Sequence, residues 1–255
     1  HAGAAARVGV MSARLVQSGF TAGQDALEGR FGFIRAFSGG KEFNDQLLLD
    51  NLGQKSYLIE SGIEIKKYPC CGSAHLALDA TFELLSNGNI DPTTVDNIQV
   101  MVDFDPPRSL IHARPTSALE GKFSMQYCLS AALLDRKVGL QSFTDEQVMR
   151  PEAQTLIPKI TMSRFSGNEG KASWSEGYNE VAIHLKDGQV LQHQARRANS
   201  GALRGVTVQD IRDKFIDCAA TVLSAEETGR VLTQLDSMES DEPVNTLTDL
   251  LRADR

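Results

Sequence analysis

The chain has 255 residues, of which 41% are hydrophobic and 23% are charged, so it is long enough for one large globular domain or two modest ones. Its net charge of -7 argues against a nucleic-acid partner, because such proteins need a broad basic face to neutralise phosphates. No apolar run approaches the roughly 18 residues that a membrane span requires, which predicts a soluble, cytoplasmic protein without a membrane partner.

The first 60 residues have the pattern of helices. Apolar residues recur at helical spacing from Ala4 to Leu15, and Gly19 follows as a stop signal, which predicts an amphipathic first helix. The spacing of Thr21 and Gln24 is that of a capping box and predicts a second, short helix. A further short helix is expected from Asp45 to Leu52.

The pattern changes near Gly62, where apolar residues begin to alternate, and this change predicts a domain boundary. A strand is expected to lead into Lys66, and a helix is expected to follow the Gly72-Ser73 turn and end near Ser86. Two lysines, two cysteines and a histidine are concentrated between Lys66 and His75. Any chemistry is therefore expected at this junction between strand and helix.

Strands and helices succeed one another from there to Arg197. Strands are expected at 98–104, 160–165, 181–185 and 190–194, with helices at 123–134, 144–149 and 152–156. The Asp187-Gly188 pair is the strongest two-residue hairpin signal in the chain. Helical periodicity returns at 207–222, 224–238 and 244–251, and Ser224 to Glu227 has the spacing of a capping box. The predicted fold class is therefore α+β, with an α+β lid (61–197) inserted between helical segments (1–60 and 198–255) that belong together.

Four residues of the junction and its helix are candidates for chemistry. His75 and Asp79 stand four apart on the expected helix, where the carboxylate can orient the ring and raise its pKa; an ordinary surface pair fits the spacing about as well. Lys66 and Lys67 are expected on opposite faces of a strand, so at most one enters a given pocket. Each lysine alone is more often a solvated charge. The residues alone indicate a local cationic pocket for a small anion.

The four cysteines (Cys70, Cys71, Cys128 and Cys218) are too sparse for a disulfide framework and predict reduced thiols. Adjacent Cys70 and Cys71 lack CxxC spacing, which argues against a zinc site. A thiol nucleophile would need a base or a helix N-terminus that lowers its pKa.

Further cations and one phenol lie on later segments. Arg114 in a loop and Lys122 can join Lys66 only through tertiary folding. Tyr127 shares an apolar helix face with Phe123, so its spacing indicates a core residue.

The ordered set of these blocks resembles the MmgE/PrpD family, which includes 2-methylcitrate dehydratase, cis-aconitate decarboxylase and iminodisuccinate epimerase. The matching residues are Lys66 to Cys71 with His75 and Asp79, Arg114-Pro115, Lys122 to Tyr127, and the opening His1-Ala2-Gly3. The resemblance implies a homodimer with a large helical domain, a smaller α+β lid and an active site between them, without metal or cofactor. It also implies that the chain begins midway through the helical domain, so this fragment alone is expected to be inactive.

The resemblance also implies roles for individual residues. Lys66 and Tyr127 match active-site positions and His75 matches a block histidine, so these three are the expected catalytic residues. His1, Arg114 and Lys122 are expected to bind a di- or tricarboxylate substrate, and Asp79 to orient a catalytic group.

Cys71 stands where the decarboxylase branch has a histidine, which favours dehydration of a 2-hydroxy tricarboxylate such as 2-methylcitrate, a reaction of propionate metabolism. The alternatives are a non-catalytic anion-binding fragment or degenerate homologue, and a family isomerase or decarboxylase.

Overall fold

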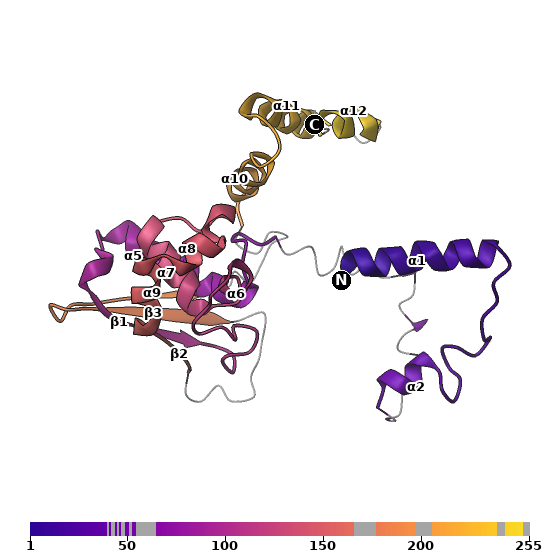
Figure 1. Cartoon of the computed structure of the whole chain (residues 1–255), viewed down its shortest axis with the longest axis horizontal. Coiled ribbons are helices and arrows are strands. Elements are labelled where there is room, and N and C mark those ends of the chain that lie inside the picture. Colours follow the sequence, from indigo (N-terminus) through magenta and orange to yellow (C-terminus); the bar gives the residue numbers. More distant parts are fainter. Residues whose placement is uncertain are drawn as a thin grey trace. The chain divides into compact units, whose positions relative to one another are not determined.

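The computed structural model describes residues 1–39, 41, 44, 46, 49–50, 53–54, 65–165, 177–196, 206–238 and 243–251. The chain divides into two units, 1–61 and 62–255, and each is described by itself. Both contain helices, and the second contains a sheet, so the α+β class is confirmed (Figure 1). The inserted-lid arrangement and the borders near 60 and 197 stay predictions.

The first unit contains α1 (Ala2–Gln17) and α2 (Phe33–Phe37). The predicted first helix is confirmed, and Gly19 follows it at φ 91°, a conformation that glycine adopts without steric cost. The helix predicted from Thr21 is wrong: residues 21–23 are irregular and a turn begins at Gln24, stabilised where the Gly29 N–H donates to the Asp25 carbonyl. Most of the helix predicted at 45–52 lies outside the described residues.

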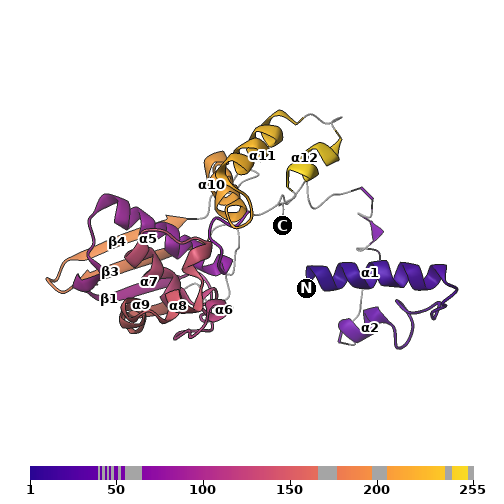
Figure 2. The same ribbon diagram turned by 45° about the horizontal axis from the view of Figure 1, so that its top comes forward.

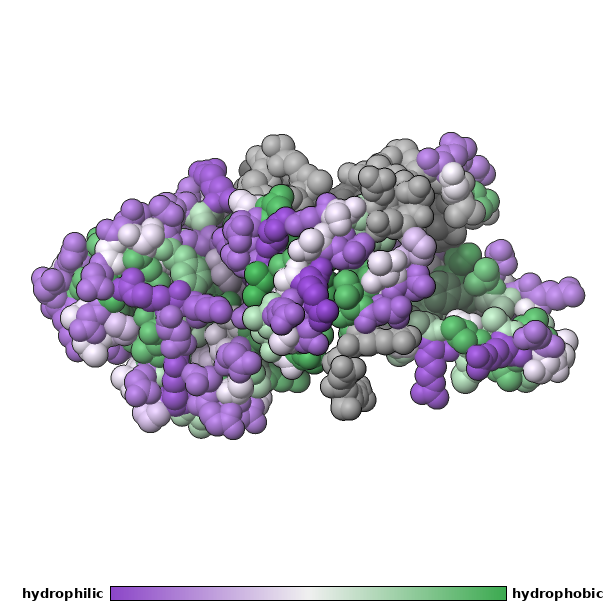
Figure 3. Space-filling model, turned by 90° about the horizontal axis from the view of Figure 1, so that it is seen from above, coloured by the Kyte–Doolittle hydropathy of each residue, from purple (hydrophilic) through white to green (hydrophobic). Residues whose placement is uncertain are grey.

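No side chain of α1 is buried among the described residues. Its large apolar residues are 43–66% exposed; they are Val8, Val10, Met11, Leu15 and Val16. Figure 3 shows apolar residues at the surface of the part that contains α1. The apolar face predicted from the sequence is thus present, and no described residue covers it.

A four-stranded sheet with the order β2-β1-β3-β4 forms the base of the second unit. Its strands are β1 (Val95–Val102), β2 (Ile160–Arg164), β3 (Tyr178–Leu185) and β4 (Val190–Arg196). β1 pairs in parallel with β2 and antiparallel with β3, and β3 pairs antiparallel with β4. The hairpin signal is confirmed, with Gly188 at φ 91° in the turn. The strand predicted to reach Lys66 is wrong at its described end, because Ile65 and Lys66 lie outside the sheet; residues 61–64 are not described.

Helices cover one face of this sheet (Figures 1 and 2). They are α5 (His75–Asn87), α6 (Ala118–Gly121), α7 (Met125–Asp135), α8 (Asp145–Met149) and α9 (Pro151–Leu156). Short 3-10 turns occur at Gly72–Ala74, Pro92–Thr94, Leu140–Ser142 and Ile157–Lys159. α5 packs on β3 and β4, while α7 packs against α5, α9 and β2. The inward residues of the strands and these helices form one apolar core.

α7 departs from its prediction as an amphipathic helix. Nine consecutive residues from Met125 to Leu133 are buried, because neighbours enclose the helix on several sides. Phe123 precedes the helix and is 38% exposed, so its predicted place on the apolar face was wrong.

Three helices follow the sheet: α10 (Val208–Ala219), α11 (Ala225–Ser237) and α12 (Val244–Leu250). All three were predicted, and the capping box at Ser224 is confirmed, with a second at Thr207. They form a small apolar cluster of their own. α10 is tied to the segment after α7, because Asp217 accepts from the Lys137 ammonium at 3.2 Å and from the Leu140 N–H at 3.3 Å. No helix among the described residues combines the length and hydropathy of a membrane span.

Candidate functional site

The junction between Lys66 and His75 is a series of bends that ends in the 3-10 turn before α5. Three contacts tie it to distant segments. The Cys71 N–H donates to the Lys122 carbonyl at 2.8 Å, and the Cys71 Sγ lies 3.1 Å from the Ser109 hydroxyl oxygen. The Ser73 hydroxyl lies 3.4 Å from the same Ser109 oxygen. Tertiary folding therefore joins three segments of the chain at the site that the sequence singles out.

Lys66 and Lys67 line the same cavity, contrary to the prediction that only one can enter a pocket. That prediction assumed a strand, and the described part of the junction has no ladder pairing that would alternate the two side chains. The Lys66 ammonium donates to the Cys70 carbonyl at 3.2 Å, while the Lys67 ammonium lies 3.3 Å from a carboxylate oxygen of Asp79. Only Lys67 is thus paired with a described acid.

Asp79 interacts with Tyr68 instead of His75. The Tyr68 hydroxyl donates to Asp79 Oδ1 at 2.7 Å, and burial, with the nearby Asp79 charge, raises the pKa of Tyr68 well above its usual value. Among the described residues, no hydrogen bond joins Asp79 to His75. The expected orienting contact to the ring is therefore corrected: Asp79 holds Tyr68 and Lys67. The sequence did not indicate that Tyr68 is part of the site, although it lies within the junction between Lys67 and Pro69.

His75 begins α5, and its ring meets the Tyr68 ring edge-on at a centroid distance of 5.2 Å. The buried His75 Nε2 has no hydrogen-bond partner among the described residues. An imidazole nitrogen without a partner is free to accept or donate a proton once a ligand or water reaches it.

Two buried thiols, Cys70 and Cys128, interact with each other, and Cys70 also interacts with His75. Cys70 is 4% exposed and Cys128 is fully buried, and the hydrogen bond between their sulfurs is the largest cause that lowers the pKa of Cys70, to about 6. His75 and Lys66 lower it further, because both favour the thiolate, against an opposing effect of burial. The same hydrogen bond and its burial raise the pKa of Cys128. All four cysteines are free thiols.

This arrangement predicts that Cys70 ionises well before an ordinary thiol. The ultraviolet absorbance of a thiolate is expected to appear in the folded protein at a pH well below the value of about 9 for an unperturbed cysteine. Cys70→Ser should abolish this step, whereas Cys218→Ser, at an exposed cysteine, should preserve it. A step that survives Cys70→Ser would refute the assignment.

The cavity at the junction has a volume of about 350 Å³, within the range of small-molecule sites. The junction itself, the turn after α7 and one face of α10 provide its walls. Its charged lining residues are Lys66, Lys67, Arg136, Lys137, Lys214, Asp210, Asp213 and Asp217. Five cations against three acids give a local positive excess in a chain whose net charge is -7. The cavity can therefore bind an anion, and of the predicted catalytic residues only Lys66 lines it.

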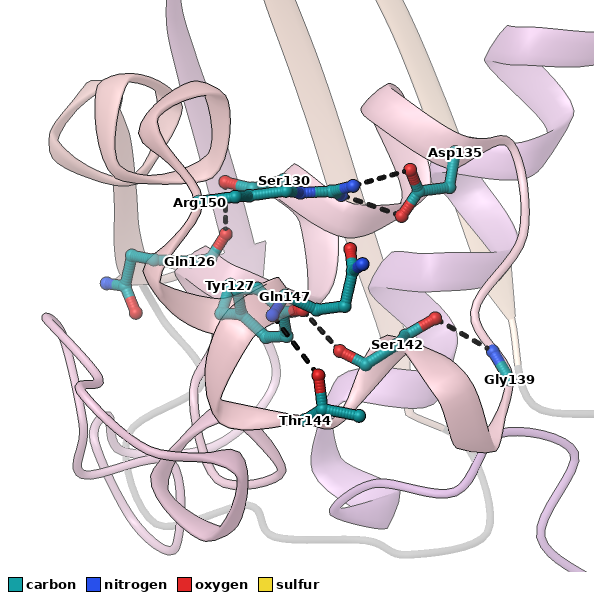
Figure 4. A network of polar contacts seen from close by, with 9 residues as sticks. All are labelled: Gln126, Tyr127, Ser130, Asp135, Gly139, Ser142, Thr144, Gln147 and Arg150. Atoms are coloured by element: carbon teal, nitrogen blue, oxygen red, sulfur yellow. Dashed lines mark hydrogen bonds and ion pairs between the residues drawn. The ribbon is translucent and has the colours of Figure 1, made fainter.

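Tyr127 lies in the core of the second unit, away from this lining. It is fully buried on α7 and its hydroxyl donates to the Ser142 carbonyl (Figure 4). Burial raises the pKa of Tyr127 to about 12. In the same network, Arg150 binds Asp135 through two bonds of 2.7 and 2.8 Å. In the structure the Tyr127 hydroxyl makes a hydrogen bond within the core. Its catalytic role stays a prediction.

Removing this hydroxyl is therefore expected to lower stability. Tyr127→Phe leaves the Ser142 carbonyl without its donor and should reduce the free energy of unfolding by about 1–3 kcal/mol, measured by denaturant titration. Tyr178→Phe is the matched control, because the Tyr178 hydroxyl has no hydrogen bond to a described residue. Equal effects of both substitutions would contradict the structural role.

The predicted substrate-binding residues are dispersed. Arg114 is exposed in a loop, and Lys122 is half-buried and contacts the junction through its backbone carbonyl. Neither lines the cavity. His1 belongs to the first unit. No group of three or more His, Cys, Asp or Glu side chains within the described ranges is arranged to hold a metal ion.

Comparison with known proteins identifies related sequences along nearly the whole chain. The MmgE/PrpD C-terminal domain matches residues 68–238 and the MmgE/PrpD N-terminal domain matches residues 1–46. Cis-aconitate decarboxylase of Mus musculus is 26% identical over 99% of this chain and 51% of its own length, and that of Homo sapiens is 25% identical over 99% and 52%. Cis-aconitate decarboxylase of Aspergillus terreus is 29% identical over 76% of this chain and 42% of its own length. The chain thus spans about half the length of the curated relatives it matches.

Proposed function

The chain belongs to the MmgE/PrpD family, and on that premise we propose that it serves in a lyase for a small di- or tricarboxylate. The observation that carries this proposal is the cavity at Lys66, where cations outnumber acids and part of the wall is apolar. A polycarboxylate with a short carbon skeleton has the matching charge and size.

The proposed reaction is dehydration of a 2-hydroxy tricarboxylate such as 2-methylcitrate. A base removes the proton alpha to a carboxylate, the electron pair of the C–H bond forms the C=C bond, and the C–O bond breaks to release the hydroxyl, which leaves as water after protonation. Negative charge develops on the carboxylate next to the reacting carbon, and positive groups already in place lower the cost of that charge. Lys66 is the proposed group for this role.

The buried Nε2 of His75 is the proposed proton-exchanging atom, because it makes no hydrogen bond to a described residue. Tyr127 would act on the leaving hydroxyl only if its own hydroxyl left the Ser142 carbonyl. Arg114, Lys122 and His1 are proposed to contact substrate carboxylates in the assembled enzyme. We propose that this enzyme is a cytoplasmic homodimer that requires no metal or cofactor and takes part in propionate metabolism.

Decarboxylation of cis-aconitate is the second candidate, and the names of the relatives favour it. The reaction also develops negative charge next to a carboxylate, so the same cations would serve it. Cys71 distinguishes the candidates, since the resemblance places a histidine there in decarboxylases. The third candidate is a non-catalytic protein that binds an anion in the same cavity.

A substrate panel tests the proposal. The 255-residue chain and the product of its whole reading frame are each incubated with 2-methylcitrate, citrate and cis-aconitate, with and without EDTA. Dehydration creates a conjugated acid that absorbs in the ultraviolet, whereas decarboxylation releases carbon dioxide. Formation of a conjugated product from 2-methylcitrate, unaffected by EDTA, is the expected result. Carbon dioxide release from cis-aconitate would replace dehydration with the second candidate, and turnover of none of these substrates would contradict the lyase proposal.

A further inference from the structure

The cations of the cavity differ in whether an acid neutralises them. Lys137 is paired with Asp217, and Lys67 with Asp79. Among the described residues, Arg136 binds neutral acceptors alone, the Leu85 carbonyl at 3.1 Å and the Asn89 amide oxygen at 2.9 Å. Its positive charge is thus not balanced by any described carboxylate.

Lys214 on α10 is the second cation of this kind. It forms no hydrogen bond or ion pair with any residue in the described part of the chain, and it lines the cavity together with Arg136 and Lys66. Among the described residues, Lys66 donates to a backbone carbonyl and forms no ion pair with a carboxylate, although its charge also favours the Cys70 thiolate. Three cations without an ion-paired carboxylate among the described residues therefore come from three separate walls: the junction, the turn after α7, and α10.

Each acid of the cavity already accepts hydrogen bonds from other groups of the protein. Asp210 accepts from the backbone N–H and hydroxyl of Thr207 at the start of α10, which lowers the pKa of that carboxyl. Asp213 accepts from the Gln209 amide at 2.8 Å. Asp217 accepts hydrogen bonds from the Lys137 ammonium and the Leu140 N–H. Neutral donors leave Asp210 and Asp213 charged, but neither forms an ion pair with Lys66, Arg136 or Lys214 among the described contacts, so these three cations can still bind an anionic ligand.

The remaining lining suits a carbon skeleton. Tyr68, Pro69, Phe82, Val138 and Leu140 supply the apolar part of the wall. An inorganic anion would leave this apolar surface unused, whereas a short carbon chain with several carboxylates satisfies both parts.

We propose that Arg136 and Lys214 bind two carboxylates of a small polycarboxylate whose remaining carboxylate lies at Lys66. α10 thus sets the number of carboxylates that the site prefers. As a statement about substrate the inference rests on the proposed lyase function, but binding can be measured without any reaction.

The test uses tricarballylate (propane-1,2,3-tricarboxylate), which lacks a hydroxyl and so cannot be dehydrated. Isothermal titration of the 255-residue chain is expected to show that Lys214→Gln weakens tricarballylate binding about tenfold, because a charge-assisted contact to a carboxylate is lost. Lys186→Gln makes the same change of charge at an exposed hairpin position outside the cavity and should leave binding unchanged. Asp213→Asn removes a negative charge from the lining and should tighten binding. Glutarate, with one carboxylate fewer, should bind more weakly to the unaltered chain and respond less to Lys214→Gln.

Each outcome bears on the site separately from the reaction. Equal binding by Lys214→Gln and Lys186→Gln, or no binding of tricarballylate to the unaltered chain, would overturn the inference. Lys214-dependent binding without turnover of any substrate would support the site and reject the lyase. If Lys214→Gln left the rate at low substrate concentration unchanged, the lyase function would stand and the role of α10 would be rejected.

Discussion

Lys66→Ala is expected to lower kcat/KM of the active enzyme by at least about tenfold, and Lys67→Ala by much less. The Lys66 ammonium lines the cavity and forms no ion pair with a carboxylate among the described residues, so it is available to a substrate carboxylate. Loss of such a charge-assisted contact costs on the order of 2 kcal/mol, which corresponds to a factor of ten or more in rate. Steady-state kinetics on the substrate identified by the panel provide the measurement.

Lys67→Ala is the matched control, because the two lysines are adjacent and line the same cavity. The Lys67 ammonium is already bound to Asp79, with both side chains 38% exposed, so solvent screens this pair and its loss should change stability by no more than about 1 kcal/mol. If both substitutions reduced kcat/KM equally while both variants stayed folded, Lys66 would lose its special role.

Amide hydrogen exchange is expected to be far slower in the core of the second unit than in α1 of the first unit. The core around β1, β3 and α7 contains many fully buried apolar residues, and its amides should exchange only through global opening. α1 has no buried residue among those described, so its amides should exchange through local fraying. With a typical stability of at least about 5 kcal/mol, protection in the core should exceed that of α1 by at least about a thousandfold.

The exposed apolar face of α1 provides a control within this experiment. Each of its large apolar side chains gains about 1.5–3 kcal/mol from full burial, so self-association would slow exchange in α1 as concentration rises. A dilution series therefore distinguishes an uncovered helix from an associated one. Strong protection of α1 in a monomer at low concentration would contradict the exposure seen in the structure.

The sequence by itself determined the local elements and the family. Alternation of apolar residues located β1 and β3, because successive side chains of a strand point to opposite faces, so a half-buried strand alternates apolar and polar residues. The hairpin signal then located β4. The hairpin turn at Gly188 and the capping box at Ser224 were readable because their geometry depends on residues a few positions apart. The same local logic failed at Thr21, where a capping-box spacing occurs without a helix.

Only the tertiary structure decided which of the candidate residues meet. Asp79 accepts from Tyr68 and forms no hydrogen bond with His75 among the described residues, and Tyr127 is held inside the core, because tertiary packing brings together residues that helical spacing does not relate. The cavity joins Lys66 to Arg136 and Lys214, and no periodic pattern links residues so far apart in the chain. Such contacts depend on how whole elements pack. The sequence therefore located the chemical groups. The fold determined that Lys66, Arg136 and Lys214, which form no ion pair with a described carboxylate, line one cavity.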